Sequence, residues 1–566
     1  MMLHAWPVLL TRIGPVLALV LLAGSVAAGL LFMLLPALGY LPALGGDTIT
    51  WRVLALALAD PRLAGSLIST LTAGIVSTLL SFLLALGFVS ILDDAKRGVL
   101  WAQHLAAGIL AVPHVALALG LAFLLAPSGW LVRGIQAATG WFHQPPDVAL
   151  IQDPHALALT LALVIKETPF LFVAMVTALG QIPVAATLRA TTAMGYGRHM
   201  AWIKVILPQL YPLVRFPVLA VLAYGLSVVD MSLILGPTNP ATWPVLILRA
   251  AYDPDLAQRF AAAAGALLQL VLVVGALLCW WGGERFLAAL LRRWSVAGAR
   301  DWPRAWSELG GWSLCLAASL GLGVVALALL VLAGWSFATN WHYPALWPDN
   351  LTLANWQRAT GDLWQTVFTS IALAVAAAAL AIIQAVACLE HEKVLAAATV
   401  RRAERWLFLP LLVPDISFLI GIQVLLLVLG LNGTWISVLW LHLLFVFPYV
   451  FLTLKEPWRR FDPRYERVAR ALGKTAWQTL WRVKLPLLIG PLAWSAAIGA
   501  AVSLTLYLPT VLAGEGRVTT LASEAVALGS SGDRRIAAVF GLAQAGIIGV
   551  LFLAAMTLAH RRRYTS

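Results

Sequence analysis

Three charged side chains interrupt the apolar runs of this sequence and are its strongest candidates for chemistry. Lys166 and Glu167 stand near the middle of one apolar run, just before Pro169, and Asp230 stands towards the end of the next run. A charge near the centre of a bilayer costs at least about 2.5 kcal/mol unless it is paired or hydrated. We expect Lys166 to pair with Asp230 across two helices, either as a structural salt bridge or as part of a path for a solute.

No other residues assemble a catalytic or metal site by their spacing. The ten histidines are dispersed, and Cys279, Cys315 and Cys388 lie singly in apolar runs, which does not fit the spacing of zinc ligands. The run Gly473-Lys474-Thr475 is similar to the end of a phosphate-binding loop. That motif needs a glycine five positions earlier, where Val468 stands, and a preceding strand. We therefore predict no catalytic residue, no metal and no cofactor in this chain.

Two polar loops repeat one spacing of glycine and proline. Gly195 and Gly473 each precede a Leu-Pro pair, and the distance from glycine to proline is 13 positions in both loops. The two copies lie 278 residues apart in a chain of 566, so we predict a duplication into two homologous halves. The residues that carry the pattern are Ala190, Gly195, Arg198, Leu207 and Pro208 in the first loop and Ala469, Arg470, Gly473, Leu485 and Pro486 in the second.

The composition indicates that these loops connect membrane spans. The chain is 61% hydrophobic and 11% charged, with a mean hydropathy of +0.88, which excludes a soluble domain with a polar surface. The first apolar run is too long for a secretory signal peptide, so we expect it to remain as a helix. The sequence predicts an all-α polytopic fold with spans near 12–38, 63–92, 103–126, 156–181, 212–236, 259–282, 311–335, 363–389, 406–430, 433–454, 488–511 and 536–559.

Basic residues predict the orientation of these spans. Of the 38 Lys and Arg, 27 lie in one set of alternate loops and nine in the other, while Lys166 and Arg215 fall within spans. Because basic residues mark cytoplasmic loops, we predict a multi-pass protein with both termini in the cytoplasm. The formal charge of +13 is spread over short runs between apolar segments, so we expect contact with membrane lipid and none with nucleic acid.

The repeat and the spans together predict three parts. Residues 1–283 form a first six-span unit with its loop at 182–208, and residues 311–566 form a second with its loop at 456–486. Residues 284–310 form a basic, Trp-bearing linker, which we expect to lie partly on the membrane surface.

The repeated spacing resembles the "EAA" signature of permease subunits of ABC importers, in which Glu-Ala-Ala is followed by Gly and then Ile-x-Leu-Pro. The sequence departs from the signature at the glutamate positions, which are Arg189 and Arg467, and at the isoleucine positions, which are Val205 and Val483. The fused arrangement resembles the iron(III), thiamine and YnjC-type permeases. The run 227–238 looks most like the last of these, and the identity of the solute stays open.

The resemblance implies a function for the loops. Each would form a short helix, turn at its glycine and dock on a separate ABC ATPase subunit, present in two copies, which uses the ATP. A periplasmic solute-binding protein would deliver a small solute to the outer loops around 237–257 and 512–534, across the bacterial inner membrane. The basic loop residues would meet an acidic partner surface or act only as cytoplasmic anchors. The alternative is a twelve-span secondary transporter driven by an ion gradient, and a membrane enzyme would lack a candidate active constellation.

Overall fold

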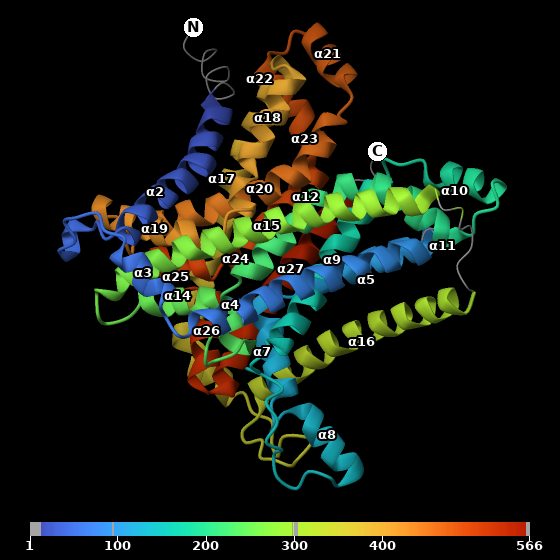
Figure 1. The fold of residues 1–566 in the computed structure, drawn as a ribbon. Helices are drawn as coiled ribbons and strands as arrows, with labels where there is room; N and C mark the ends of the chain where they lie inside the picture. The colour runs from blue at the N-terminus through green and yellow to red at the C-terminus, as the bar shows by residue number, and fades with distance from the viewer. Residues whose placement is uncertain (1–12, 93–95, 297, 299–303, 562–566) are drawn as a thin grey trace. The chain divides into compact units, whose positions relative to one another are not determined.

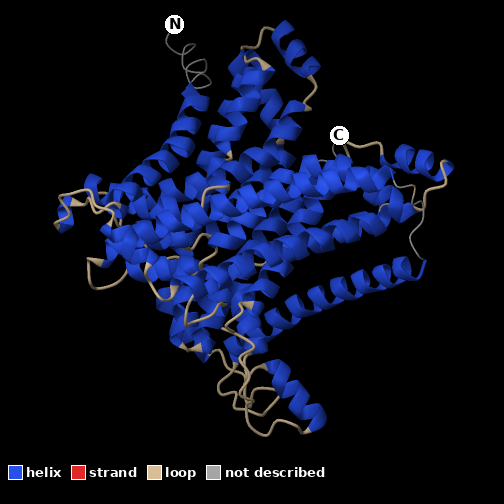
Figure 2. Cartoon of the chain, in the orientation of Figure 1, coloured by secondary structure: helices blue, strands red, loops and turns tan. Residues whose placement is uncertain are grey.

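The computed structural model describes residues 13–92, 96–296, 298 and 304–561 (Figure 1). Within these residues the regular elements are all helices, and β pairing is limited to three isolated bridges (Figure 2). The predicted all-α fold is therefore confirmed. The described residues do not include the two chain ends, on which the predicted location of the termini depends. They also leave out residues 297 and 299–303 of the predicted linker.

Ten helices of the described residues are long and apolar enough to cross a membrane, and a pair bent by 78°, Ala476–Leu487 with Ile489–Thr505, makes an eleventh. The count is close to the predicted twelve, and the span that falls short is 406–430. Prolines 410 and 414 interrupt its helix, because proline lacks a backbone donor. Only α19 (Asp415–Leu429) remains, 15 residues or about 22 Å long, which is shorter than a hydrocarbon core of roughly 30 Å.

The described helices form two compact units, and one of these is the continuous segment Trp51–Leu351. Its α-helices are α3 (Arg52–Leu58), α4 (Leu63–Leu71), α5 (Ser77–Leu92), α6 (Lys96–Ala111), α7 (His114–Leu125), α8 (Trp130–Thr139), α9 (Leu157–Leu179), α10 (Val184–Ala193), α11 (Arg198–Ala201), α12 (Leu207–Ser227), α13 (Asp230–Leu235), α14 (Trp243–Ala251), α15 (Gln258–Val296) and α16 (Arg304–Phe337). Two π-helical turns, η3 (Thr72–Val76) and η4 (Trp202–Ile206), interrupt this series.

The other unit consists of Met1–Thr50 and Thr352–Ser566. Its α-helices are α2 (Ser25–Ala37), α17 (Ala354–His391), α18 (Ala397–Leu407), α19, α20 (Trp435–Arg459), α21 (Pro463–Ala471), α22 (Ala476–Thr479), α23 (Leu485–Leu487), α24 (Ile489–Thr505), α25 (Leu508–Gly514), α26 (Leu521–Ser531) and α27 (Arg534–Arg561). Its shorter turns are η1 (Val20–Gly24), η2 (Pro42–Leu44), η5 (Glu392–Val394), η6 (Leu409–Leu411) and η7 (Leu480–Lys484).

The two compact units cut across the two halves of the sequence. The first long helix, which includes α2, packs against α19 of the second half, and α16, which begins within the predicted linker, packs against α7 of the first half. Both crossings are close: a Cβ added at Gly421 would overlap the carbonyl oxygen of Gly29, and one added at Gly120 would lie 2.5 Å from that of Ala328. Small residues allow such an approach of two backbones. The predicted boundaries 1–283, 284–310 and 311–566 describe the duplicated sequence and stay a prediction.

The first part of the predicted linker continues the sixth span. Helix α15 runs without interruption from Gln258 to Val296, which gives it a length of about 58 Å, almost twice the hydrocarbon core. Its last three turns therefore continue the helix of the sixth span, and the placement of the linker on the membrane surface stays a prediction.

Candidate functional site

The first candidate loop is a helix, a glycine turn and a second helix. Helix α10 ends at Ala193, and Gly195 follows with a φ of +80°, which is the left-handed conformation that glycine adopts without strain. The N–H of Gly195 donates to the carbonyl of Thr192 at 2.9 Å and that of Tyr196 to the carbonyl of Thr191 at 3.0 Å. This pair of bonds is the Schellman ending of a helix. Helix α11 then begins at Arg198.

The second candidate loop has the same geometry. Helix α21 ends at Ala471, Gly473 has a φ of +78°, and the N–H groups of Gly473 and Lys474 both donate at 3.0 Å, to the carbonyls of Arg470 and Ala469. Thr475 caps α22 through a capping box with Gln478. The predicted glycine turns are thus confirmed in both loops.

The Leu-Pro pairs lie where each loop enters its span. A π-helical turn precedes both, η4 in the first loop and η7 in the second, at the same 278-residue spacing. Pro208 stands in the first turn of α12, as expected for a residue that begins a helix. Pro486 begins only the three-residue helix α23, after which the chain bends into α24.

The basic residues of the two loops have different surroundings. Arg198 is half-buried and donates to the carbonyl of Ser90 at 3.2 Å, so it also ties the loop to the end of α5. Arg464, Arg467 and Arg470 are exposed on α21. The second loop therefore presents three cations to solvent from one short helix.

Lys166 is buried, as predicted, but its partners are not the predicted carboxylates. Its Nζ donates to the carbonyl oxygens of Ile109 at 3.2 Å, Leu110 at 3.3 Å and Val112 at 2.6 Å. These carbonyls lie at the end of α6, which stops before Pro113, and that of Ile109 also accepts from the N–H of Val112 at 3.2 Å. A cation at the carboxyl end of a helix also interacts favourably with its dipole. Lys166 is therefore a cap for a broken span.

The expected pair of Lys166 with Asp230 is wrong for this structure, because no ion pair joins the two among the residues that it describes. Asp230 is half-buried, begins α13, and accepts a bond at 2.8 Å from the N–H of Met231. Glu167 is buried with 8% of its surface exposed. The sequence showed that these charges lie in spans, but it gave no signal for the carbonyls that Lys166 contacts.

We predict that Lys166→Met lowers the amount of folded protein, because it leaves three carbonyls without a charged donor and hydrogen bonds to charged groups contribute about 1.5–3 kcal/mol. Asp230→Leu should have a smaller effect, and the double substitution should show the sum of both losses. Size-exclusion recovery of the membrane-extracted variants measures this. Recovery of the double variant to the wild-type amount would establish the direct pair instead.

The fifth span of each half is broken at an equivalent place. Helix α12 ends at Ser227 and α13 begins at Asp230, while α24 ends at Thr505 and α25 begins at Leu508, again 278 residues later. The predicted continuous spans 212–236 and 488–511 are therefore corrected to two helices each. Irregular backbone at membrane depth is tolerated where it is buried in protein or lines a wet cavity.

A buried glutamine of the sixth span holds each break. Gln269 Nε2 donates to the carbonyl of Leu226 at 2.8 Å, and Gln544 Nε2 donates to that of Leu504 at 2.7 Å. Both glutamines are fully buried, and their Oε1 atoms have no donor among the described residues. Sequence reasoning missed them, although a polar residue recurring 275 positions later in an apolar run was a signal.

His442 joins the two sides of the break in the second half. Its ring nitrogens lie 2.7 Å from Ser503 Oγ on α24 and 2.9 Å from Thr510 Oγ1 on α25. His442 is buried with 1% exposed. His442 therefore packs within its span and also bridges two helices.

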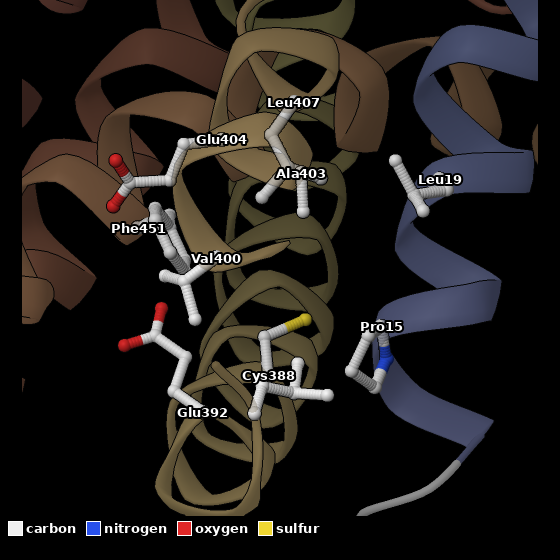
Figure 3. A pocket seen from close by; sticks show the side chains of 10 residues that line it. Pro15, Leu19, Cys388, Glu392, Val400, Ala403, Glu404, Leu407 and Phe451 are labelled. Atoms are coloured by element: carbon white, nitrogen blue, oxygen red, sulfur yellow. The ribbon is translucent and has the colours of Figure 1, made fainter. Parts of the chain in front are cut away.

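A small cavity lies beside α18 (Figure 3). Its volume is about 30 Å³, enough for roughly one water molecule and far below the ~300 Å³ of a solute pocket. The carboxylates of Glu392 and Glu404 lie on one side of it, and Arg459 pairs with both at 3.0 and 2.6 Å. Cys388 lies on the same cavity, so its thiol is enclosed rather than reactive at the surface.

Comparisons with known proteins give similar sequences among inner-membrane transport proteins. Residues 351–565 match the family described as the binding-protein-dependent transport system inner membrane component. Over 529 residues the chain is 29% identical to the inner membrane ABC transporter permease protein YnjC of Escherichia coli (strain K12), which covers 93% of this chain and 94% of that protein.

Proposed function

We propose that this chain is a fused, two-half permease of the ABC transporter family and that it moves a small solute across the inner membrane while separate ATPase subunits supply the energy. The chain is a multi-pass membrane transport subunit rather than a catalytic enzyme. The observation that carries the proposal is the matched pair of helix–glycine–helix loops. Both have a positive φ at the glycine and the same two closing bonds, 278 residues apart.

Each loop offers a docking site for one ATPase subunit, which gives two copies per chain. The residues at the turns and helix ends of the proposed docking sites are Ala190, Gly195, Arg198, Leu207 and Pro208, and Ala469, Arg470, Gly473, Leu485 and Pro486. The exposed arginines of α21 favour an acidic groove on the partner.

The ATP is proposed to be used by the partner subunits alone. The run Gly473-Lys474-Thr475 lies between α21 and α22, and a helix rather than a strand precedes it. That setting lacks the strand and glycine-rich loop that hold phosphates in an ATPase.

The broken fifth spans support a solute path through the permease. Discontinuous helices with free backbone groups are the usual place of solute contact in transporters. Asp230 at the first break and the buried oxygens of Gln269 and Gln544 supply polar groups there. Glu167 belongs to the same proposal, whereas the three carbonyl bonds of Lys166 support a structural role for that residue.

The outer ends of the two halves also match. The N–H of Trp243 at the start of α14 donates to Thr70 Oγ1, and the N–H of Leu521 at the start of α26 donates to Ser370 Oγ, both at 2.9 Å. Helices α14 and α26 belong to the regions 237–257 and 512–534, which we propose as the docking surface of a periplasmic solute-binding protein, with both termini in the cytoplasm. This equivalence supports a matching docking surface on each half.

We predict that the full chain, extracted in mild detergent from its native membrane, retains two copies of an ABC ATPase subunit. Native mass spectrometry of the purified complex gives the stoichiometry, and reconstituted vesicles loaded with ATP should take up solute from a medium that contains the binding protein. A chain that carries no ATPase subunit, and whose uptake stops when a protonophore collapses the proton gradient, would instead be an ion-driven transporter.

A further inference from the structure

We propose that the two loop helices are held in place by different forces: α21 by a cluster of four charged side chains, and α10 by apolar packing. We refer to Glu390, Lys393, Glu466 and Lys484 as the charge cluster. That the charge cluster matters for transport rests on the proposed docking of ATPase subunits. That it positions α21 does not depend on the docking.

The charge cluster joins the second loop to the ends of two spans. Lys484, the last residue of η7, places its Nζ 2.5 Å from Glu390 Oε1 and 3.4 Å from Glu466 Oε1. Lys393 Nζ lies 2.8 Å from both Glu390 Oε2 and Glu466 Oε1. Each carboxylate therefore lies between two ammonium groups, and the cluster has no net charge. Such mutual pairing is what allows charges to leave water.

Two aromatic rings cover the most buried member. Lys484 is only 2% exposed, and its Nζ lies 4.2 Å from the ring centre of Trp458 and 5.4 Å from that of Phe461. Trp458 also donates from Nε1 to Glu390 Oε1 at 3.1 Å. The rings contribute cation–π contacts and fix the direction of the ammonium group.

Helix α21 has little else to hold it. Ala469 is its one buried residue, and its larger apolar side chains, Tyr465, Val468 and the following Leu472, are more than half exposed. Glu466 is therefore its main link to η5 and η7. Burial acts to raise the pKa of Glu466, but the hydrogen bond and charge of Lys393 and the charge of Lys484 lower the pKa below its ordinary value. The carboxylate is ionised at neutral pH.

The first loop has apolar residues at the equivalent positions. The spacing of 278 places Leu188 at the position of Glu466 and Ile206 at the position of Lys484. Ile206 is fully buried in a cluster with Val184 and Trp202, and Leu188 packs against it. Leu188 and Ile206 thus help to hold α10 by apolar packing, where Glu466 and Lys484 hold α21 by charge.

The two forces respond differently to salt. Ions screen partly exposed charges, with a Debye length of about 10 Å at 0.1 M and about 3 Å at 1 M, but they do not weaken apolar packing. The side chain of Lys393 is 39% exposed, so salt reaches the charge cluster. High ionic strength should therefore loosen α21 and leave α10 unchanged.

Hydrogen–deuterium exchange of the full chain in nanodiscs tests the proposal through peptides that cover α21 and α10. In the wild type, raising NaCl from about 0.05 M to about 1 M should speed exchange of α21 several-fold and leave α10 unaffected. Lys484→Met should speed exchange of α21 on the order of tenfold at low salt, because it leaves buried carboxylates under-compensated. Arg482→Met is the matched control, since Arg482 carries the same charge on the same π-helical turn but is exposed.

The double variant Glu466→Leu/Lys484→Ile transplants the pair of the first loop and leaves Glu390 paired with Lys393. It should restore protection of α21 and remove its salt dependence. Glu466→Gln is the milder second variant if Lys484→Met does not fold. Equal exchange of α21 in wild type and Lys484→Met, or the same salt response in α10 and α21, would overturn the proposal. A further outcome is that the double variant loses its salt dependence while substitution of Gly195 or Gly473 leaves ATPase retention unchanged. That pair of results would support the positioning of α21 by the charge cluster and refute the docking function.

Discussion

Gly421→Val should abolish recovery of folded protein, the largest effect that we expect from one substitution. Gly421 of α19 faces Gly29 of the first long helix, and an added Cβ would overlap the carbonyl oxygen of Gly29. Helix α2 would have to move away along its whole contact with α19, and forced overpacking costs about 1–3 kcal/mol even where side chains can yield. The backbone of α2 cannot shift as a side chain can, so we expect a loss of stability of about 3 kcal/mol or more. Fluorescence-detected size-exclusion chromatography measures the folded fraction.

Gly546→Ala is the matched control for this crossing. Gly546 lies in α27 of the same unit, and an added Cβ there meets no atom within 4 Å. The control should recover at the wild-type amount, since alanine favours a helix over glycine by up to about 1 kcal/mol. Wild-type recovery of Gly421→Val would show that α2 does not pack against α19 in the membrane.

Gly473→Val should release the ATPase subunit from the second loop while the permease itself stays folded. The φ of +78° is strained for a β-branched residue by roughly 1–2 kcal/mol or more, and relief of that strain breaks the two bonds that close the turn. The helices α21 and α22 would then lose their relative direction. We expect retention of the ATPase subunit to fall about tenfold, which corresponds to ~1.4 kcal/mol, with uptake falling at least as far.

Gly473→Asn separates backbone strain from steric contact. The space around Gly473 is open, with no atom within 4 Å of an added Cβ, and asparagine tolerates the left-handed region better than valine. The asparagine variant should therefore retain most of the ATPase subunit. Gly195→Val in the first loop should behave as Gly473→Val does. Normal retention and uptake in both valine variants would contradict the docking assignment.

The sequence alone predicted the features that depend on local chemistry. Long apolar runs required membrane helices, since backbone groups in lipid must bond within the segment. The repeated Gly-to-Pro spacing predicted both loops, and the φ values of Gly195 and Gly473 confirm the turns because a positive φ is a local requirement that glycine meets. The sequence predicted one continuous span at 103–126, and the structure divides it at Pro113 into α6 and α7, because proline lacks a backbone donor.

The tertiary structure decided which segments meet. Nothing in the pattern of α2 or α16 indicates that each packs on the other half of the sequence, because a uniformly apolar helix has no face that marks its partner. The sequence showed that Lys166 needed compensation but not that broken backbone at Val112, rather than the carboxylate of Asp230, supplies it. The charge cluster brings Glu390 to Lys484 across 94 residues. Charges and free carbonyls are satisfied by whatever lies within about 3 Å, and only the folded chain determines what that is.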